Sequence, residues 1–176
     1  MFAWLRRGPD DEAVARVYEL IVAQSRRPEF YRDLGVADSL DGRFDMLSLH
    51  AMLVLRRLKH DPARTGRFSQ ALFDHMFMDM DMSLREIGVG DLSVGKRVKE
   101  MGSAFLGRIV AYEKGLSEGQ EALADALTRN VYREQAPEAS VLQRLADYVL
   151  RVDDRLATVP LTVILAGEKA FEDSLP

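Results

Sequence analysis

The chain has 176 residues, of which 47% are hydrophobic and 30% are charged, a composition that predicts one globular domain with a substantial core. It contains no cysteine, which excludes disulfides, thiolate catalysis and cysteine metal sites. No apolar run in the sequence approaches the roughly 20 residues that a membrane-spanning helix needs.

The net charge of −4 is unevenly distributed along the chain. Residues 117–176 hold eleven acidic and six basic side chains, a net charge of −5, which leaves +1 for residues 1–116. Two basic runs in that first part are either solvated helix faces or contacts for nucleic acid or anionic lipid headgroups, and no specific nucleic-acid motif accompanies them. The runs are Arg56, Arg57, Lys59, Arg64 and Arg67, and Lys96, Arg97 and Lys99.

The first nine residues predict an N-terminal arm ahead of a single helical domain, residues 10–176. The aromatic and cationic side chains of the arm suit a weak contact with a membrane surface, and the alternative is an arm that folds on the body or is disordered. The arm is too short for a secretory signal or a transit peptide, so we expect a bacterial cytoplasmic protein or a mature form without its targeting segment. The side chains concerned are Phe2, Trp4, Leu5, Arg6 and Arg7.

A period near 3.6 runs through every long segment, which predicts an all-α fold, a single compact domain of six to eight helices. Residues 161–166 are strand-like, but they have no partner strand, so we interpret them as a short helix or a docked extended segment. Helices are expected over 10–26, 28–34, 43–60, 64–87, 91–114, 118–133 and 137–159, with a loop over 36–42 and a break at 115–117.

The most informative stretch is residues 72–90, LFDHMFMDMDMSLREIGVG. Glycine readily adopts the left-handed conformation of a helix end, so Gly88 and Gly90 predict the turn. The expected buried face consists of Phe73, Met76, Phe77, Met80, Leu84 and Ile87. The opposite side mixes charges with methionines, and flexible methionines outside a core suit a surface that adapts to varied apolar partners. It consists of Asp74, Met78, Asp81 and Arg85, flanked by His75, Asp79, Met82 and Glu86.

The helix that follows the two glycines also has a clear apolar stripe. Gly102 and Gly107 lie inside it, and because interior glycine costs up to about 1 kcal/mol relative to alanine, they predict close approach of a neighbour. The short connection predicts an antiparallel hairpin, in which Lys96, Arg97, Lys99 or Arg108 approaches the carboxylates of the preceding helix. Within that helix, Arg85 is expected to pair with Asp81, four residues before it. The stripe consists of Val94, Val98, Met101, Phe105, Ile109 and Tyr112.

The chemistry that these residues offer is sparse. His75 and Asp79 have the four-residue spacing of a helical metal pair, with Met78 as a soft ligand, but no matching second pair occurs. A helix-surface hydrogen bond is the plainer interpretation. The sequence has no GxGxxG, P-loop or GxSxG motif, so we expect no enzyme, no resident metal and no cofactor. A helical haem- or metal-binding protein is the competing class, and a peripheral membrane adaptor is a third.

We therefore interpret the chain as a helical protein-binding module. Negative charges would orient a partner, methionines would take its apolar groups, and lysines would flank the contact. The alternative is that the charges only hold two helices in register. The predicted contact residues are Asp74, Met78, Asp79, Asp81, Met82, Arg85, Lys96 and Lys99.

The ordered string from Leu72 to Asp91 resembles the signature of the ubiquinol–cytochrome c chaperone family. The likeness continues through Val94-Gly95-Lys96-Arg97-Val98-Lys99 to Phe105, Gly107-Arg108 and Ala111-Tyr112-Glu113. It is strongest over residues 27–116, and the C-terminal third adds nothing to it. The double glycine followed by a basic helix makes this string far more specific than a helix with carboxylates alone.

The resemblance implies an assembly factor for the respiratory cytochrome bc1 complex that binds immature cytochrome b or another immature bc1 subunit. Mitochondrial members act with a small helper protein near the ribosome. The chain lacks their long N-terminal extension, so we expect a bacterial relative in the cytoplasm, peripheral to the inner membrane, or a matrix or inner-membrane protein if it is a mature eukaryotic form. The resemblance does not decide whether this chain contacts a ribosome or a helper protein. The resemblance carries over Asp74, Asp79, Asp81, Arg85, Gly88, Gly90 and Lys96 as contact or scaffold residues.

Overall fold

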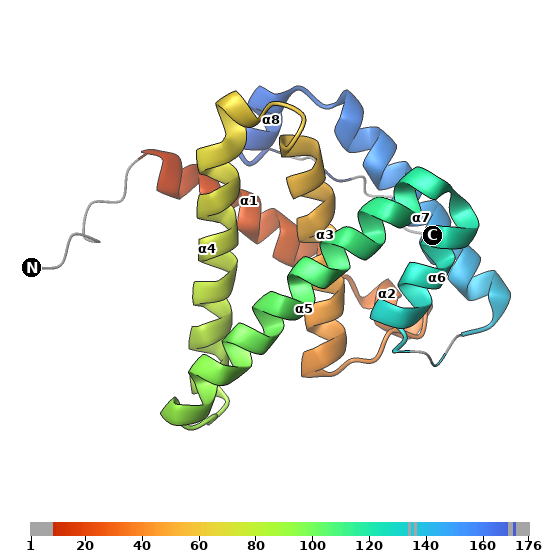
Figure 1. Cartoon of the computed structure of the whole chain (residues 1–176), viewed down its shortest axis with the longest axis horizontal. Coiled ribbons are helices and arrows are strands. Elements are labelled where there is room, and N and C mark those ends of the chain that lie inside the picture. Colours follow the sequence, from red (N-terminus) through yellow and green to blue (C-terminus); the bar gives the residue numbers. More distant parts are fainter. Residues whose placement is uncertain (1–8, 134, 136, 169–170, 172–176) are drawn as a thin grey trace, which may run out of the picture.

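A computed structural model describes residues 9–133, 135, 137–168 and 171 (Figure 1). These residues form helices and connecting turns without a β-strand, which confirms the predicted all-α fold. No helix in the described part is long and apolar enough to cross a membrane. Residues 1–8, most of the predicted arm, lie outside the described residues. The helices are α1 (Pro9–Ser25), α2 (Pro28–Arg32), α3 (Leu40–Leu58), α4 (Pro62–Glu86), α5 (Asp91–Glu118), α6 (Gln120–Asn130), α7 (Ala139–Thr158) and α8 (Leu161–Leu165).

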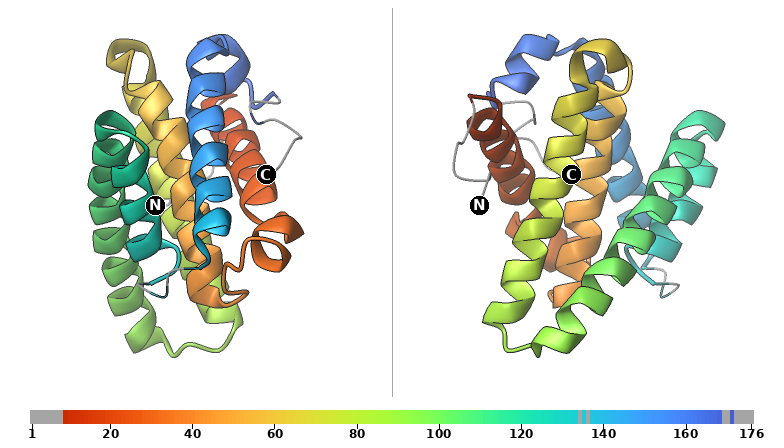
Figure 2. Two further views of the ribbon diagram at one scale, coloured as in Figure 1. Left: turned by 90° about the vertical axis from the view of Figure 1, so that its right-hand side faces the viewer. Right: turned by 60° about the vertical axis from the view of Figure 1, so that its left-hand side comes forward.

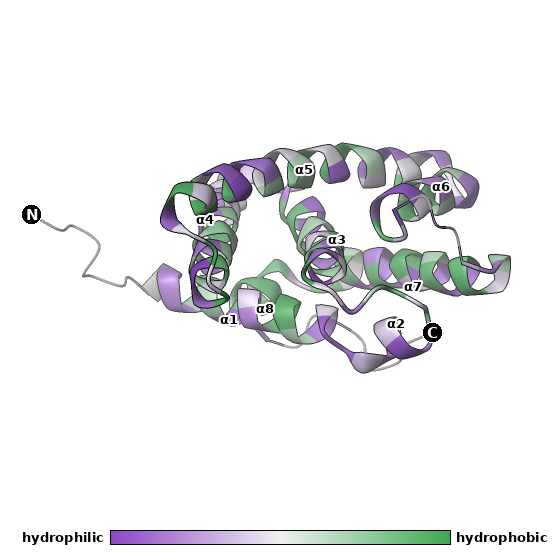
Figure 3. Ribbon diagram, turned by 90° about the horizontal axis from the view of Figure 1, so that it is seen from below, coloured by the Kyte–Doolittle hydropathy of each residue, from purple (hydrophilic) through white to green (hydrophobic). Residues whose placement is uncertain are grey.

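Helix α3 lies at the centre of the molecule and packs against α1, α4, α5 and α7. Figure 3 shows three layers: α5 with α6, then α4, α3 and α7, then α1, α2 and α8. Twelve of the 19 residues of α3 are buried, because apolar side chains occur around its whole circumference and such a helix is stable only when other elements cover it. Met46, Leu49 and Leu53 have no exposed surface.

Buried polar groups on α3 are paired across helices. His50 Nδ1 donates to the Met46 carbonyl oxygen at 2.8 Å, so its Nε2 is left to accept from the Tyr148 hydroxyl at 2.7 Å. The Gln24 amide in turn donates to the Tyr148 oxygen at 2.8 Å. This chain of hydrogen bonds joins α1, α3 and α7 and requires a neutral imidazole. Burial lowers the pKa of His50 from 6.5 to about 4.

The lowered pKa of His50 predicts a loss of stability in acid. Between pH 6.5 and about 4, position 50 takes up a proton only in the unfolded chain. The free energy of unfolding therefore decreases as the pH is lowered through this range, by up to about 3 kcal/mol in total. This contribution is fully present above pH 6.5. Denaturant unfolding of His50→Gln should show a shallower fall over this range than wild type. The exposed His60→Gln is the control and should match wild type, whereas equal slopes for all three proteins would contradict the prediction.

The break expected at residues 115–117 is wrong, because α5 continues to Glu118 and the chain turns at Gly119, where φ is +107°. Gly115 marks a close approach instead. A Cβ atom added there would lie 2.8 Å from Leu123 Cα, so glycine lets α6 pack directly on α5 (Figure 2). A glycine that permits packing and a glycine that ends a helix look the same in sequence.

Helix α3 begins earlier than predicted, at Leu40, so the loop expected over 36–42 is shorter. The Ser39 side chain accepts a hydrogen bond from the Gly42 backbone N–H at 3.1 Å and caps the helix. A Cβ atom on Gly42 would lie 1.9 Å from the Ala37 carbonyl oxygen, so the loop folds tightly over this first turn. Residues 161–165 form a helix, which confirms one of the two alternatives for the strand-like run.

Helices α4 and α5 form the predicted hairpin, whose arms diverge from a turn at Gly88, where φ is +86° (Figure 1). Aromatic rings fill the angle between the arms: Phe105 lies 5.9 Å from both Phe73 and Phe77, between ring centroids. The Phe77 ring also lies 3.7 Å from the Cβ position of Gly102. The close approach expected at Gly107 is wrong, since nothing lies within 4 Å of its Cβ position.

Phe105 is fully buried in this aromatic cluster. Phe105→Ala should lower the free energy of unfolding by about 3–5 kcal/mol, because the truncation leaves a cavity. Chemical denaturation measures the change. The neighbouring Leu106 is 55% exposed, so Leu106→Ala is a matched control and should change stability by no more than about 0.5 kcal/mol. Similar losses for the two variants would contradict this assignment of the buried face.

Candidate protein-binding surface

The outer face of α4 is exposed as predicted. Met78 and Met82 are 59% and 53% exposed, while Met76 and Met80, two residues before each, are 2% and 6% exposed in the core. One helix therefore presents methionines on two sides with different surroundings. Ile87, expected on the buried face, is 62% exposed, because α4 ends at Glu86 and Ile87 no longer follows the helical stripe.

Charged groups on this face are held in place by neighbours along the chain. Arg85 Nε donates to Asp81 Oδ1 at 2.6 Å, which confirms the predicted four-residue pair. Arg85 Nη1 also bonds to Asp91, the first residue of α5, and so links the two arms of the hairpin beside the turn. Gln70 donates to Asp74 at 2.8 Å. Arg85 therefore links α4 to the start of α5, whereas its bond to Asp81 lies within α4.

Asp79 and His75 lie on a different side of α4 and contact α1. The Tyr18 hydroxyl donates to Asp79 Oδ2 at 2.7 Å, and the Tyr18 ring meets the His75 ring edge-on, with centroids 5.0 Å apart. Burial and the bond to Asp79 raise the pKa of Tyr18, so the hydroxyl keeps its proton as the donor. Asp79 therefore supports the α1–α4 contact. No cluster of three or more side chains suited to a metal occurs in the part of the chain that the structure describes.

Arg108 does not approach the carboxylates of α4, so that expectation is wrong. It lies three residues after Phe105 and four before Tyr112, on the buried stripe of α5, and points toward α3. Arg108 Nη2 donates to Asp45 Oδ1 at 2.5 Å, and its guanidinium carbon lies 5.2 Å from the centre of the Phe44 ring. The pair joins α5 to α3 inside the protein.

Lys96 and Lys99, the predicted contact lysines of α5, are exposed, and within the described residues neither is bonded to α4. Lys96 Nζ lies 3.8 Å from Glu100 of its own helix. In the first basic run, by contrast, three side chains connect helices. Arg56 pairs with Asp153, Arg57 donates to the carbonyl oxygens of Leu156 and Val159 at the end of α7, and Lys59 pairs with Glu113. These three are structural ties rather than a free basic patch.

Exposed apolar side chains concentrate on the hairpin, including several that sequence reasoning missed. Leu92, Leu106 and Val110 are 100%, 55% and 68% exposed. Their spacing along the helix places them opposite the buried stripe of α5. This spacing is the feature of the sequence from which their exposure could have been predicted. Of the large hydrophobic side chains described as exposed, all but Leu40 lie on α4, α5 or the turn between them. We call the following residues the hairpin surface: Met78, Met82, Ile87, Leu92, Leu106 and Val110.

Most of the chain resembles proteins of one family. A sequence profile described as ubiquinol–cytochrome C chaperone matches residues 32–171. The chain belongs to this family. The match extends beyond residues 27–116 into the last two helices, so the expectation that the C-terminal third adds nothing was wrong.

Similar proteins support the same assignment. The crystal structure of the Cbp3 homolog from Brucella abortus is 39% identical, with a TM-score of 0.82 over 93% of this chain and 91% of that one. A Xenopus laevis protein named ubiquinol-cytochrome-c reductase complex assembly factor 1 is 26% identical over 89% of this chain and 78% of its own length. Yeast Protein CBP3, mitochondrial, is 28% identical over 58% of this chain, and the match spans 32% of the yeast protein. The chain spans about half the length of the mouse and human relatives.

Exposure of the two outer methionines predicts a mild effect on folding. Replacing Met78 and Met82 together by glutamine should change the free energy of unfolding by no more than about 0.5 kcal/mol. Met76 and Met80 have the same spacing on the same helix but are buried, so their double replacement by glutamine should cost about 2–6 kcal/mol as amides enter the core. Thermal and denaturant unfolding of both pairs measures this difference. A large loss in the outer pair would show that a neighbour covers it.

Proposed function

We propose that the protein is an assembly chaperone for the cytochrome bc1 complex and that its client is immature cytochrome b, held on the hairpin surface. Membership of the ubiquinol–cytochrome c chaperone family supports the general role. The relatives named as ubiquinol–cytochrome c reductase assembly factors support the choice of complex. The action is binding, so no catalytic group is invoked.

The observation that carries this proposal is the concentration of exposed apolar side chains on one hairpin. A membrane subunit that awaits assembly presents apolar helices, and an exposed apolar surface is what such a client would contact. Methionine suits this task because its unbranched thioether adapts to different shapes. Leu92, Leu106 and Val110 on α5 would extend the contact beyond the face predicted from α4.

Two exposed glycines on α5 fit the same role. Nothing lies within 4 Å of the Cβ positions of Gly95 and Gly107, so no packing within the described chain calls for glycine there. Each lies in a helix interior, where glycine costs about 1 kcal/mol relative to alanine. Glycines and other small residues on a helix face let a second helix approach closely, as they do between membrane helices. At either position a client helix would be able to approach the backbone of α5 closely.

The charges around the hairpin surface would orient the client. Asp74 and Asp81 are acidic groups beside Met78, whereas Lys96 and Lys99 on α5 are basic and exposed. Such a division favours one direction of a bound helix over the reverse. Arg85 and Asp79 are assigned scaffold roles, because each already bonds to a neighbouring element.

The same proposal implies a place of action beside the membrane in which the bc1 complex is built. For a bacterial protein this is the cytoplasmic side of the inner membrane, and for a mature eukaryotic form it is the mitochondrial matrix or inner membrane. The yeast relative is named as mitochondrial.

Affinity capture tests the proposal. The tagged protein is recovered from detergent-solubilised membranes of cells that are synthesising the bc1 complex, and cytochrome b is measured by mass spectrometry. Leu106→Gln with Val110→Gln should reduce its recovery at least about tenfold, the equivalent of 1.4 kcal/mol, while the fold is kept because both positions are exposed. Met78→Gln with Met82→Gln should act in the same direction.

The control is Glu121→Gln with Asp125→Asn, two exposed positions on α6 that are not part of the hairpin surface. It should recover cytochrome b as wild type does. Normal recovery by both hairpin variants would remove the hairpin surface from the proposal. Absence of any bc1 subunit from the wild-type capture would overturn the function. Haem absorbance and elemental analysis of the same purified protein test the competing class of haem or metal binders.

A further inference from the structure

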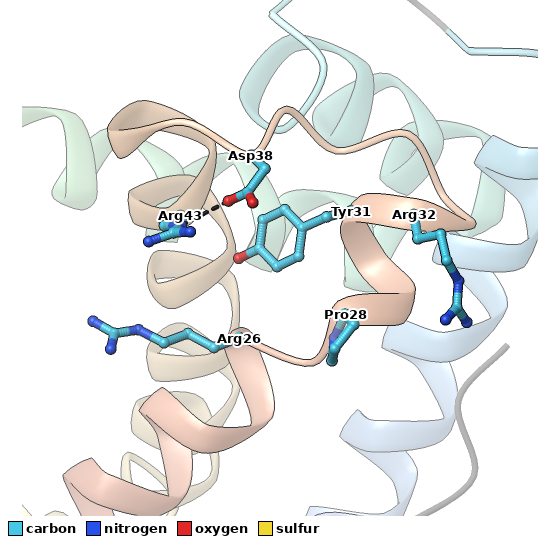
Figure 4. A pocket seen from close by; sticks show the side chains of 6 residues that line it. All are labelled: Arg26, Pro28, Tyr31, Arg32, Asp38 and Arg43. Atoms are coloured by element: carbon cyan, nitrogen blue, oxygen red, sulfur yellow. Dashed lines mark hydrogen bonds and ion pairs between the residues drawn. The ribbon is translucent and has the colours of Figure 1, made fainter.

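A pocket on the opposite side of α3 from α5 has no role in the contact proposed above. It lies between the end of α1, helix α2 and the first turns of α3, and has a volume of about 570 Å³, within the size range of small-molecule sites. Three arginines, one aspartate, one tyrosine and one proline line it (Figure 4): Arg26, Arg32, Arg43, Asp38, Tyr31 and Pro28.

The arginines of this pocket differ in their availability. Arg32 forms two hydrogen bonds to Asp33, at 2.7 and 2.6 Å, and points away from the others in Figure 4. Arg26 has no ion pair among the described residues. Arg43 uses its Nε on Asp38, at 2.7 Å, which leaves its two terminal nitrogens to donate. Figure 4 shows Arg26 and Arg43 extending to the same side of the pocket. Two guanidinium groups, one from the turn that follows α1 and one from α3, therefore face one space.

Tyr31 gives this space a fixed aromatic wall. Its hydroxyl donates to the Ser25 carbonyl oxygen at 2.8 Å, which anchors the ring between the two arginines. Burial raises the pKa of Tyr31, so the phenol stays neutral and does not repel an anion. Pro28 adds a second apolar ring at the edge. A ligand here would meet cationic donors on one side and flat apolar groups on the other.

We propose that this pocket binds a phosphate ester, with the phosphate between Arg26 and Arg43 and the organic part against Tyr31. A phosphate carries about −1.5 to −2 charges and three acceptor oxygens, so it can engage two guanidinium groups at once. A carboxylate has only two oxygens, and Asp38 already supplies one such group to Arg43. The chemistry is shared by soluble phosphate monoesters and by the monoester headgroup of phosphatidic acid.

Titration calorimetry with phenyl phosphate tests the site in the full-length protein. Phenyl phosphate should bind at least about tenfold more tightly than benzoate, which has the same ring and a carboxylate, because charge-assisted bonds to phosphate are stronger and more numerous. It should also bind more tightly than inorganic phosphate, which cannot use the ring. Equal binding of phenyl phosphate and benzoate, or no binding at millimolar concentration, would overturn the proposal.

Variants assign the binding to this pocket. Arg26→Gln should weaken phenyl phosphate binding about tenfold or more, and it breaks no ion pair in the described structure, so the fold is retained. Arg43→Gln should act similarly. Arg32→Gln is the matched control, because its side chain is paired elsewhere, and it should bind as wild type does. A loss with Arg32→Gln as large as that with Arg26→Gln would indicate general attraction to positive charge and would overturn the site.

Vesicles distinguish the sources of the phosphate. If the protein floats with vesicles that contain phosphatidic acid, and Arg26→Gln reduces this flotation while Arg32→Gln does not, the ligand is a lipid headgroup. Phenyl phosphate binding without flotation assigns a soluble ester, and either result supports the pocket. Retention of a single-stranded oligonucleotide but of neither phosphate probe would overturn it, because it would indicate an extended nucleic-acid surface. Capture of cytochrome b should be unaffected by Arg26→Gln.

Discussion

The carboxylate of Asp45 ties together the parts of the molecule that position the hairpin. Asp45 has no exposed surface, and Arg108 from α5 and Arg133 from the segment after α6 both donate to it. Burial raises the pKa of Asp45 while the two arginines oppose that shift. Removing one member of a buried pair typically costs about 3–5 kcal/mol, because the other charge is left unpaired. The orientation of α5 on α3, and hence of everything α5 presents outward, depends on this contact.

Arg133 shows that the contact is maintained at a conformational cost. Its φ of 51° lies in the left-handed region that residues other than glycine rarely adopt. In this conformation its side chain reaches both Asp41 and Asp45 at the start of α3. The inner side of α5 is thereby fixed, while its outer side carries Leu106 and Val110 in solvent. A rigid helix whose inner face is packed against the protein suits the presentation of an apolar outer surface to a partner.

Local regularities were predictable from sequence, and long-range pairings were not. The 3.6-residue period located the helices and the buried side of α4, and the four-residue spacing identified the bond between Asp81 and Arg85. The pairing of Asp45 with Arg108 spans 63 positions and has no local signature. Gly115 was misassigned as a helix break because the residue that requires a glycine there, Leu123, lies on another helix. Leu106 and Val110 were overlooked because each directly follows a residue of the apolar stripe, Phe105 or Ile109, and so reads as part of the same apolar run.

The position of the methionines on α4 has a chemical consequence. A thioether exposed to solvent can be oxidised to a sulfoxide, which is polar and chiral, whereas a buried thioether is shielded by its neighbours. Met78 and Met82 are exposed, and Met76 and Met80 are enclosed. An oxidant would thus change the outer face of α4 from apolar to polar and leave the core of the same helix intact. Methionine sulfoxide reductases reverse this reaction, so the change in surface character is reversible in a cell.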